Sequence, residues 1–213
     1  MSDEVRAYEA ANAYLNEGLI RLAASLAPRD SDALDGPHGA ARLVGPQLSR
    51  RLRMLRFLPR LGHPERTFPA VHVGGTSGKG STATLIAELL HAHGVGTGLH
   101  VTPYLQVCTE KLWARGRYAS GRELASLVEW VRPHAEACRG ADVPMHGMAS
   151  VAITLEHYRR EAVAVGVVEV GVGGHNDITN VLDTRVAVIG AVGLDHLKTL
   201  GPGIDDIAWH KAG

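Results

Sequence analysis

A glycine-rich loop between a predicted strand and a predicted helix constrains the fold more than any other feature of the sequence. Residues 70–73 form a short run typical of a β-strand, and the apolar residues of 81–93 recur with helical spacing up to Gly94. A loop in this position offers backbone N–H groups, a helix N-terminus and here a lysine to a phosphate chain. The predicted phosphate-binding residues are Gly75, Thr76, Ser77, Gly78, Lys79, Gly80 and Ser81. We expect Lys79 to reach the β- and γ-phosphates of a nucleotide.

The loop departs from the strict P-loop pattern GxxxxGK[ST] at two places. Val73 stands where the first glycine is usual, and Gly80 separates Lys79 from the hydroxyl of Ser81. The alternative is an ordinary glycine-rich turn without a ligand. The sequence Gly-Lys-Gly-Ser between a strand and a helix disfavours that alternative.

From residue 70 onward, strands and helices alternate. Near-continuous apolar runs at 163–170 and 186–192 predict strands that are covered on both faces, as in a parallel sheet with crossover helices. Residues 97–101 predict another strand, residues 112–118 a hairpin, and residues 148–161 a helix. Ser120 and Glu123 form a capping box that starts a further helix. We therefore expect an α/β fold with a P-loop-containing, mostly parallel sheet flanked by helices.

The N-terminal region predicts two helices. In residues 4–27 the apolar positions are Tyr8, Ala11, Leu15, Leu19 and Leu22, and in the second helix they are Leu48, Leu52, Leu55 and Leu58. Residues 28–45, rich in Pro, Gly and Asp, predict a connector. The second helix has a basic face of Arg50, Arg51, Arg53, Arg56 and Arg60. We interpret this face as a solvated surface, with contact to an anionic, polyglutamylated ligand as the alternative. We expect residues 1–66 to pack on a P-loop domain of residues 67–213.

Composition excludes several classes of function. The 213 residues are 45% hydrophobic and 21% charged, enough for a core that needs no disulfide or metal. Lys plus Arg and Asp plus Glu each total 22, so no overall basic charge draws the chain to nucleic acid or to an anionic membrane.

The first residues lack the order of a signal peptide, and Glu169 interrupts the apolar stretch 162–172. We expect Cys108 and Cys138 to be reduced thiols, and a disulfide between them is the alternative. We expect a cytoplasmic monomer.

The motif GTxGKGS after a strand resembles the loop of the Mur ligase superfamily, in its folylpolyglutamate and dihydrofolate synthase branch. Residues 53–55, residues 61–64 and the loop 171–180 also resemble segments of that family. The resemblance implies a Mur ligase central-domain fold. It also implies an ATP-dependent ligase that adds L-glutamate to a folate or dihydropteroate carboxylate through an acyl phosphate. The family continues beyond the segment that matches 211–213 into a C-terminal ligase domain. We therefore expect this chain to be incomplete and inactive by itself.

The same resemblance implies a magnesium site. Its ligands would be Thr102, Glu169 and His196, and Lys211 would be carbamylated and help hold a second magnesium ion. Lys79, Lys211 and His196 would be catalytic. An acidic residue in an apolar strand is costly, which a hard cation with oxygen ligands would explain independently. The alternatives are a Glu169 exposed at a strand end, a structural His196 and a solvated Lys211.

Several residues depart from the family pattern. His175 stands where an arginine is usual, Tyr104 replaces a histidine, Thr102 replaces a serine, Lys111 replaces an arginine and Ser77 replaces an asparagine. Most of these positions surround the loop that receives the pterin substrate in the family. The departures therefore leave the identity of the acyl substrate undetermined.

Three other functions also stay open. They are another Mur-type amide ligase, a P-loop NTPase or kinase, and a nucleotide-binding module without catalysis.

Overall fold

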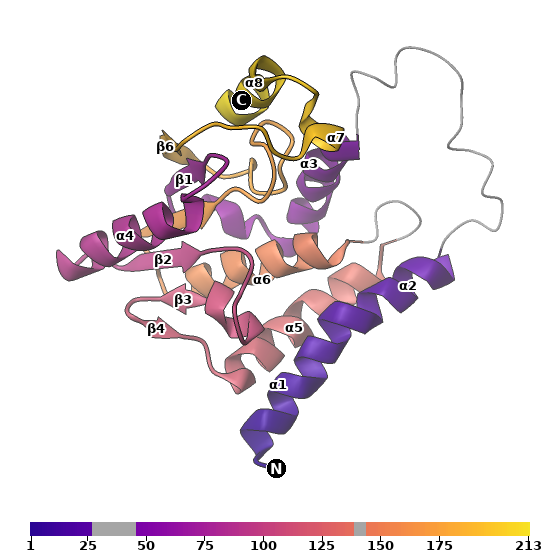
Figure 1. The fold of residues 1–213 in the computed structure, drawn as a ribbon. Coiled ribbons are helices and arrows are strands. Elements are labelled where there is room, and N and C mark those ends of the chain that lie inside the picture. The colour runs from indigo at the N-terminus through magenta and orange to yellow at the C-terminus, as the bar shows by residue number, and fades with distance from the viewer. Residues whose placement is uncertain (27–45, 139–143) are drawn as a thin grey trace.

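The computed structural model describes residues 1–26, 46–138 and 144–213, and Figure 1 shows their fold. The helices are α1 (Asp3–Ala13), α2 (Leu19–Leu26), α3 (Pro46–Phe57), α4 (Lys79–Ala92), α5 (Gly121–Glu136), α6 (His146–Arg160), α7 (Leu197–Leu200) and α8 (Ile204–Ala212). The strands are β1 (Ala70–Gly74), β2 (Thr97–His100), β3 (Trp113–Ala114), β4 (Arg117–Tyr118), β5 (Val165–Glu169) and β6 (Thr184–Ile189). A π-helical segment, η1 (Tyr14–Gly18), joins α1 to α2, and η4 (Leu58–Leu61), η5 (Pro64–Arg66) and η6 (Cys108–Lys111) are 3-10 turns.

The strands form one sheet with the order β4-β3-β2-β5-β1-β6. The pairs β2–β5, β5–β1 and β1–β6 are parallel, whereas β3 and β4 form an antiparallel hairpin that continues the sheet from β2. The predicted α/β class, the mostly parallel sheet and the hairpin are therefore confirmed. Because β1, β2, β5 and β6 run in one direction, their carboxyl ends meet at one edge, where ligands of open α/β sheets bind.

One strand differs from its prediction. The apolar run 186–192 was expected to be covered on both faces, but β6 ends at Ile189 and lies at the edge of the sheet. The exposed fractions of Val186 and Ile189 are 52% and 47%. The prediction was wrong because an apolar run indicates a strand but not its place in the sheet.

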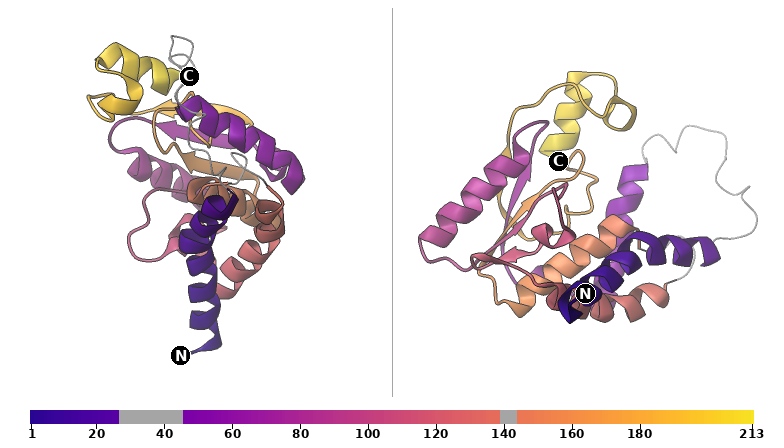
Figure 2. Two further views of the ribbon diagram at one scale, coloured as in Figure 1. Left: turned by 90° about the vertical axis from the view of Figure 1, so that its right-hand side faces the viewer. Right: turned by 60° about the horizontal axis from the view of Figure 1, so that its bottom comes forward.

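Two hydrophobic cores lie on opposite faces of the sheet. Val73, Leu99 and Val167 point to α4, where they pack on Ala83 and Ala87. The next residue of β5, Val168, belongs to the larger core under α5 and α6, since successive side chains of a strand alternate between faces. Figure 2 shows α4 on one side of the sheet and α1, α5 and α6 together on the other.

A pair of glycines makes room for the rings of Tyr158 and Phe68 on the larger core's side of the sheet. Gly98 of β2 and Gly166 of β5 are register partners. A Cβ at Gly98 would come within 2.7 Å of the Tyr158 ring, and one at Gly166 within 2.7 Å of the Phe68 ring. The two rings meet edge to face with centroids 5.4 Å apart. These positions therefore need glycine for packing.

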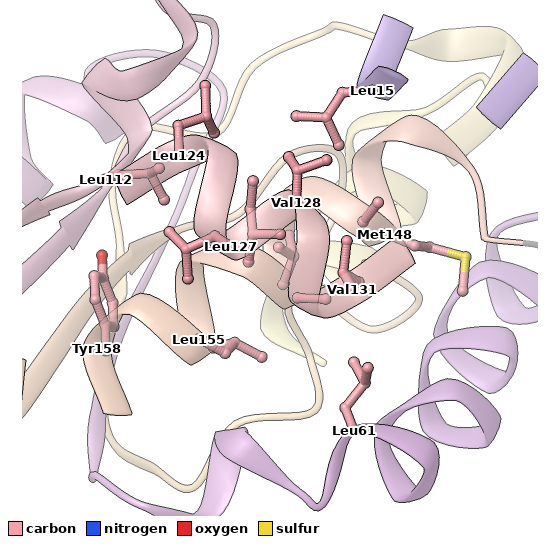
Figure 3. Packing of buried hydrophobic residues seen from close by; sticks show 14 of the residues in the cluster. Leu15, Leu61, Leu112, Leu124, Leu127, Val128, Val131, Met148, Leu155 and Tyr158 are labelled. Atoms are coloured by element: carbon pink, nitrogen blue, oxygen red, sulfur yellow. The ribbon is translucent and has the colours of Figure 1, made fainter. Parts of the chain in front are cut away.

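The N-terminal helices share the larger core. Ala11, Leu15 and Leu19 are buried against α5 and α6, as the helical spacing predicted. Figure 3 shows Leu15 above Val128 and Met148. The sequence did not indicate that the helix passes through a π-helical segment. The division into residues 1–66 and 67–213 stays a prediction, and the predicted connector 28–45 lies outside the described residues.

The buried face of α3 differs from the prediction. Leu58 is buried as predicted, but Leu52 and Leu55 are 41% and 40% exposed, and Met54 and Phe57, which were not among the predicted positions, are buried instead. Met54 and Phe57 belong to the larger core, so contact with that core, which the spacing of apolar residues does not specify, decides which positions are buried. The side chain of Leu48 lies outside the described residues.

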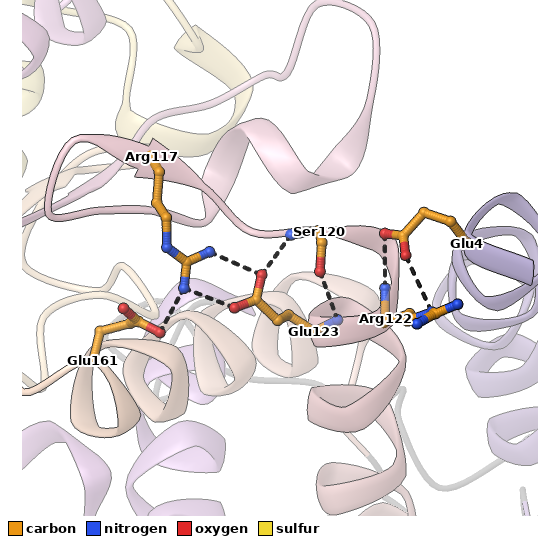
Figure 4. A network of polar contacts seen from close by, with 6 residues as sticks. All are labelled: Glu4, Arg117, Ser120, Arg122, Glu123 and Glu161. Carbon is orange, nitrogen blue, oxygen red and sulfur yellow. Dashed lines mark hydrogen bonds and ion pairs between the residues drawn. The ribbon is translucent and has the colours of Figure 1, made fainter.

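Exposed charges around the start of α5 are paired with one another. Ser120 and Glu123 form the predicted capping box, in which the Glu123 side chain also accepts from the N–H of Ser120. Arg117 donates to Glu123 and to Glu161, and Arg122 pairs with Glu4 of α1, as Figure 4 shows. These contacts join the hairpin, α1, α5 and the end of α6 at the surface.

Two further observations bear on the predictions from composition. Within residues 1–26, 46–138 and 144–213, no helix combines the length and hydropathy that a membrane span needs. Cys108 and Cys138 are both buried, and neither forms a disulfide within the described residues.

Candidate nucleotide and metal site

The phosphate loop joins β1 to α4 at the carboxyl edge of the sheet. Gly75 has φ 140° and lies against the backbone of Gly190, and Gly78, with φ 77°, is the N-cap of α4. Both φ values favour glycine, which explains two of the loop's glycines. The helix begins at Lys79, two residues earlier than the predicted Ser81. Lys79 and Gly80 therefore belong to the first turn, whose N–H groups are free to bind an anion.

The segment after β6 fixes the loop. The N–H of Thr76 donates to the carbonyl of Ala191 at 2.7 Å, and the Thr76 hydroxyl bonds to the backbone of Gly193 in both directions at 3.0 Å. These bonds use the Thr76 side chain for structure. Ser77, Gly78 and Ser81 are exposed at the same edge.

Glu169 is the last residue of β5 and is 4% exposed. Its Oε2 accepts the N–H of Thr102 at 2.7 Å, and its Oε1 lies 3.9 Å from Nζ of Lys79. Burial raises the pKa of the Glu169 carboxyl, against the opposing effects of the Thr102 N–H, the Lys79 charge and the Gly80 N–H. The alternative of an exposed glutamate at a strand end is therefore wrong. The carboxylate is desolvated and only loosely paired.

Glu169 and Thr102 fit a hard cation by their chemistry. They bring a carboxylate and a hydroxyl together at the ends of β5 and β2, and Mg²⁺ prefers oxygen ligands and keeps several waters. No group of three or more His, Cys, Asp or Glu side chains suited to a metal occurs in the part of the chain that the structure describes. An ion at this edge would therefore take most of its ligands from water and phosphate.

Lys211 belongs to α8 and is 8% exposed. Its Nζ donates to the carbonyl of Gly75 at 2.7 Å, so the side chain reaches from the C-terminal helix to the phosphate loop. Burial and the charge of Lys79 lower the pKa of the Lys211 amine, and Asp195 opposes this shift. The alternative of a solvated lysine is therefore wrong.

His196 lies differently from the expectation. It was predicted directly after a strand, but β6 ends at Ile189, and His196 is the N-cap of α7 with φ 51°. Its side chain is 47% exposed, and its Nε2 lies 3.6 Å from Asp195 Oδ2. The described contacts do not join His196 to Glu169 or Lys211. The charge of Asp195 raises the pKa of Lys211. The sequence analysis did not identify Asp195, because the family resemblance indicated only the neighbouring histidine.

The loop 171–180 is held by Asp177. One carboxylate oxygen accepts from the N–H of Val172 at 3.0 Å, and the other accepts from the N–H and the hydroxyl of Thr179 at 2.9 and 2.5 Å. His72 Nε2 donates in turn to the Thr179 hydroxyl at 2.7 Å. His175, at the position of the family's arginine, bonds to the carbonyl of Gly213 and packs on Trp209.

The same loop corrects the interpretation of the basic face on α3. Nε of Arg51 donates to the carbonyl of Asn180 at 2.6 Å, so this arginine supports the loop rather than a solvated surface. Arg50 and Arg60 are exposed, in agreement with the interpretation.

A small cavity lies beside Glu169, with a volume of about 60 Å³. His100 and Thr102 from the end of β2, Ser150 from α6, and Lys111 line it with Asp177. Burial and Lys111 hold the pKa of His100 to about 4, and its Nδ1 bonds to Thr154, so the ring is neutral at pH 7. Sequence reasoning did not identify His100 or Asp177 as pocket residues, because the fold alone brings β2, α6 and the loop 171–180 together.

Fold and site together define a P-loop-containing α/β protein of the Mur ligase type. No family model matches the chain. A dihydrofolate synthase/folylpolyglutamate synthase of Bacillus subtilis is 35% identical over 85% of this chain and 43% of its own length. A folylpolyglutamate synthase of Lacticaseibacillus casei is 37% identical over 76% of this chain and 38% of its own. A solved structure described as an FPGS–AMPPCP–folate complex superposes with a TM-score of 0.78 at 31% identity, over 97% of this chain and 45% of that one.

The chain belongs to the folylpolyglutamate and dihydrofolate synthase family. It spans less than half the length of these relatives.

Proposed function

We propose that the protein is the ATP-binding part of a ligase that adds L-glutamate to the carboxylate of a folate or a dihydropteroate. The observation that carries the proposal is the buried Glu169 carboxylate beside Lys79 and the start of α4. A carboxylate and a lysine at a phosphate loop suit a magnesium-bound nucleotide. The relatives' names supply the ligase activity, and one related structure is described as holding both AMPPCP and folate.

The phosphate loop would bind the triphosphate of ATP. The N–H groups in the first turn of α4 have no partner within the helix, and Lys79 adds a positive charge that can follow the γ-phosphoryl group. Lys79 is not locked in a short ion pair, because its carboxylate neighbour is 3.9 Å away and its bond to the Thr76 carbonyl is 3.4 Å long. It can therefore turn to a phosphate.

We also propose that the site binds magnesium, and the family resemblance implies two ions. When bound, magnesium would offset the charge that develops on the transferring phosphoryl group. Thr102 and Glu169 would hold the first ion, and His196 and Lys211 would engage the second. Glu169 is kept in place for this role by the N–H of Thr102.

The proposed reaction has two group-transfer steps. A carboxylate oxygen of the acyl substrate attacks the γ-phosphorus, forming an O–P bond while the P–O bond to ADP breaks. The amino nitrogen of L-glutamate then attacks the acyl carbon of this acyl phosphate and loses its proton to solvent. The tetrahedral intermediate expels inorganic phosphate and leaves an amide. Lys79 would stabilise negative charge along this path, and Lys211 and His196 would contribute through the second magnesium ion that they engage.

Carbamylation of Lys211 is a further part of the proposal. The neutral amine would form an N–C bond to carbon dioxide and release one proton, which gives an anionic oxygen ligand. The buried position of Nζ at the carbonyl of Gly75 keeps the amine away from bulk water. Isotope-labelled carbon dioxide should give a carbamate signal by NMR that is absent from Lys211→Met. An identical signal in that variant would place the carbamate elsewhere.

Phosphate release tests the proposed function. The protein expressed from its complete reading frame is given ATP and magnesium, with dihydropteroate or tetrahydrofolate, in the presence and absence of L-glutamate. We expect phosphate release to require both co-substrates. Release that ignores both would identify an NTPase. Tight nucleotide binding without release would identify a non-catalytic module, and release only with a cell-wall precursor would identify another Mur-type ligase.

We also propose that the protein acts as a cytoplasmic monomer on small molecules. The balanced charge and the two buried cysteine side chains, which form no disulfide within the described residues, support this proposal. Light scattering of the purified protein would measure the mass of the particle, and a dimer would overturn the monomer.

A further inference from the structure

Lys111 is a half-buried cation that the proposed nucleotide chemistry does not use. It ends η6 and lines the cavity of about 60 Å³ next to Glu169 and Thr102. Burial lowers the pKa of its amine, so the ammonium is partly removed from water. A desolvated ammonium normally has a carboxylate partner, because an unpaired buried charge is costly.

The neighbours of Lys111 offer little compensation. Its Nζ lies 3.5 Å from the hydroxyl of Ser150, the outer limit of a hydrogen bond, and 5.1 Å from the centre of the Tyr104 ring. No carboxylate lies within 4.0 Å of Lys111 among residues 1–26, 46–138 and 144–213. The protein therefore presents this charge to the cavity without an internal counter-ion.

The acidic and basic groups around the cavity are engaged elsewhere. Asp177 uses both carboxylate oxygens for the N–H groups of Val172 and Thr179 and for the Thr179 hydroxyl. Glu169 faces Thr102 and Lys79, and Nδ1 of His100 bonds to the Thr154 hydroxyl at 3.0 Å. An anion that enters the cavity would therefore meet one unpaired positive charge, that of Lys111.

We propose that Lys111 binds the reacting carboxylate of the acyl substrate and turns it toward the γ-phosphate. This inference rests on the proposed function. The cavity has room for a carboxylate but not for a pterin ring, so the acid end of the substrate must enter first. The position between Lys111 and Glu169 lies at the carboxyl ends of β2 and β5, beside the phosphate loop. Lys111 is thus a binding and positioning residue that selects an anionic acceptor.

Nucleotide phosphates are the other anions that could reach this cavity. They already have the N-terminus of α4 and Lys79 on the opposite side of Glu169. We therefore expect Lys111 to bind the substrate carboxylate rather than a phosphate. The affinity for the nucleotide should depend little on Lys111.

A pair of ligands that differ only in charge tests this inference. Calorimetry measures the affinity of pteroate and of its neutral amide, pteroamide, for the chain saturated with AMPPCP and magnesium. We expect Lys111→Met to weaken pteroate about 10- to 100-fold, as for a lost charge-assisted hydrogen bond, and to change pteroamide less than about twofold. Lys111→Arg should restore most of the pteroate affinity. Lys198→Met, at an exposed lysine of α7, is the matched control and should leave both affinities unchanged.

The outcomes separate the inference from the function on which it rests. Equal losses for pteroate and pteroamide would show a merely structural role and overturn the inference, with thermal unfolding of each variant reporting its fold. A loss confined to AMPPCP affinity would assign Lys111 to the nucleotide. If the unsubstituted chain binds AMPPCP but neither pteroate nor pteroamide, the proposed function fails and the inference fails with it.

Discussion

Two regions of this molecule treat charge in opposite ways. At the surface of the helical layer, Arg117, Glu123 and Glu161 are partly exposed, and Arg117 lies 2.7 Å from Glu123 and 2.9 Å from Glu161. At the carboxyl edge of the sheet, Glu169 is buried and Lys111 is half-buried, and among the described residues neither has a charged partner closer than 3.9 Å. Charges that stabilise the fold are paired with each other at the surface. Charges that bind a ligand have no close partner within the protein until the ligand is present.

The helical layer also contains most of the fold's packing. Leu124, Leu127, Val131 and Met148 are almost fully buried between α5 and α6. The sheet edge is built mainly from loops and strand ends. We expect substitutions in the first region to change stability and those in the second to change binding.

The largest expected effect on stability comes from the core. Leu127→Ala should lower the free energy of unfolding by about 2–5 kcal/mol, because it removes a 1%-exposed side chain and leaves a cavity. Urea denaturation would measure the change. Leu85→Ala, at a 65%-exposed position on α4, is the control and should cost less than about 0.5 kcal/mol. Equal effects of the two variants would contradict the assignment of the core.

The next effect concerns the sheet edge. Glu169→Gln should weaken the binding of AMPPCP with magnesium about 100-fold, or about 2.8 kcal/mol, since it removes the anionic oxygen proposed for the cation. The free chain should unfold at the same or a higher temperature, because a loosely paired buried carboxylate stabilises little. Glu129→Gln, at an exposed position of α5, is the control. Unchanged magnesium-dependent affinity would remove Glu169 from the site.

The smallest effect concerns the paired surface charges. Hydrogen bonds from Arg117 and from Ser120 lower the pKa of Glu123 to about 2 from 4.5, so these contacts stabilise the fold fully above pH 4.5 and lose their contribution as the pH falls toward 2. Because Arg117 is half exposed, Arg117→Met should cost only about 0.5–1 kcal/mol at pH 7. Urea denaturation should show a smaller difference at pH 2 and in 1 M salt. A difference that is constant with pH would mean that packing, not charge, is lost.

The sequence predicted the parts of the fold that depend on local pattern. The phosphate loop, the capping box at Ser120, the hairpin and the buried positions of the first helix follow from residue type and spacing. The exposure of β6 and the buried face of α3 could not be predicted, because both depend on which neighbours lie alongside. The same limit applies to the π-helical segment at 14–18.

The candidate site was predictable in part for the same reason. Glu169 stood out as an acid in an apolar strand, and the structure places it against Lys79 and Thr102. The burial of Lys111 and the neutral His100 escaped notice, because tertiary packing alone produces a shared cavity from distant segments. His196 was expected directly after a strand, but six residues separate it from the end of β6.

We propose that the sheet edge keeps its charges for a magnesium-bound nucleotide. The most direct measurement is the free energy of unfolding with and without AMPPCP and magnesium, for the chain and for Lys79→Met. At a ligand concentration of about 100 times Kd, the chain should gain about 2.7 kcal/mol. Lys79→Met should gain almost nothing. An equal gain in both, or no gain in the unsubstituted chain, would contradict the account.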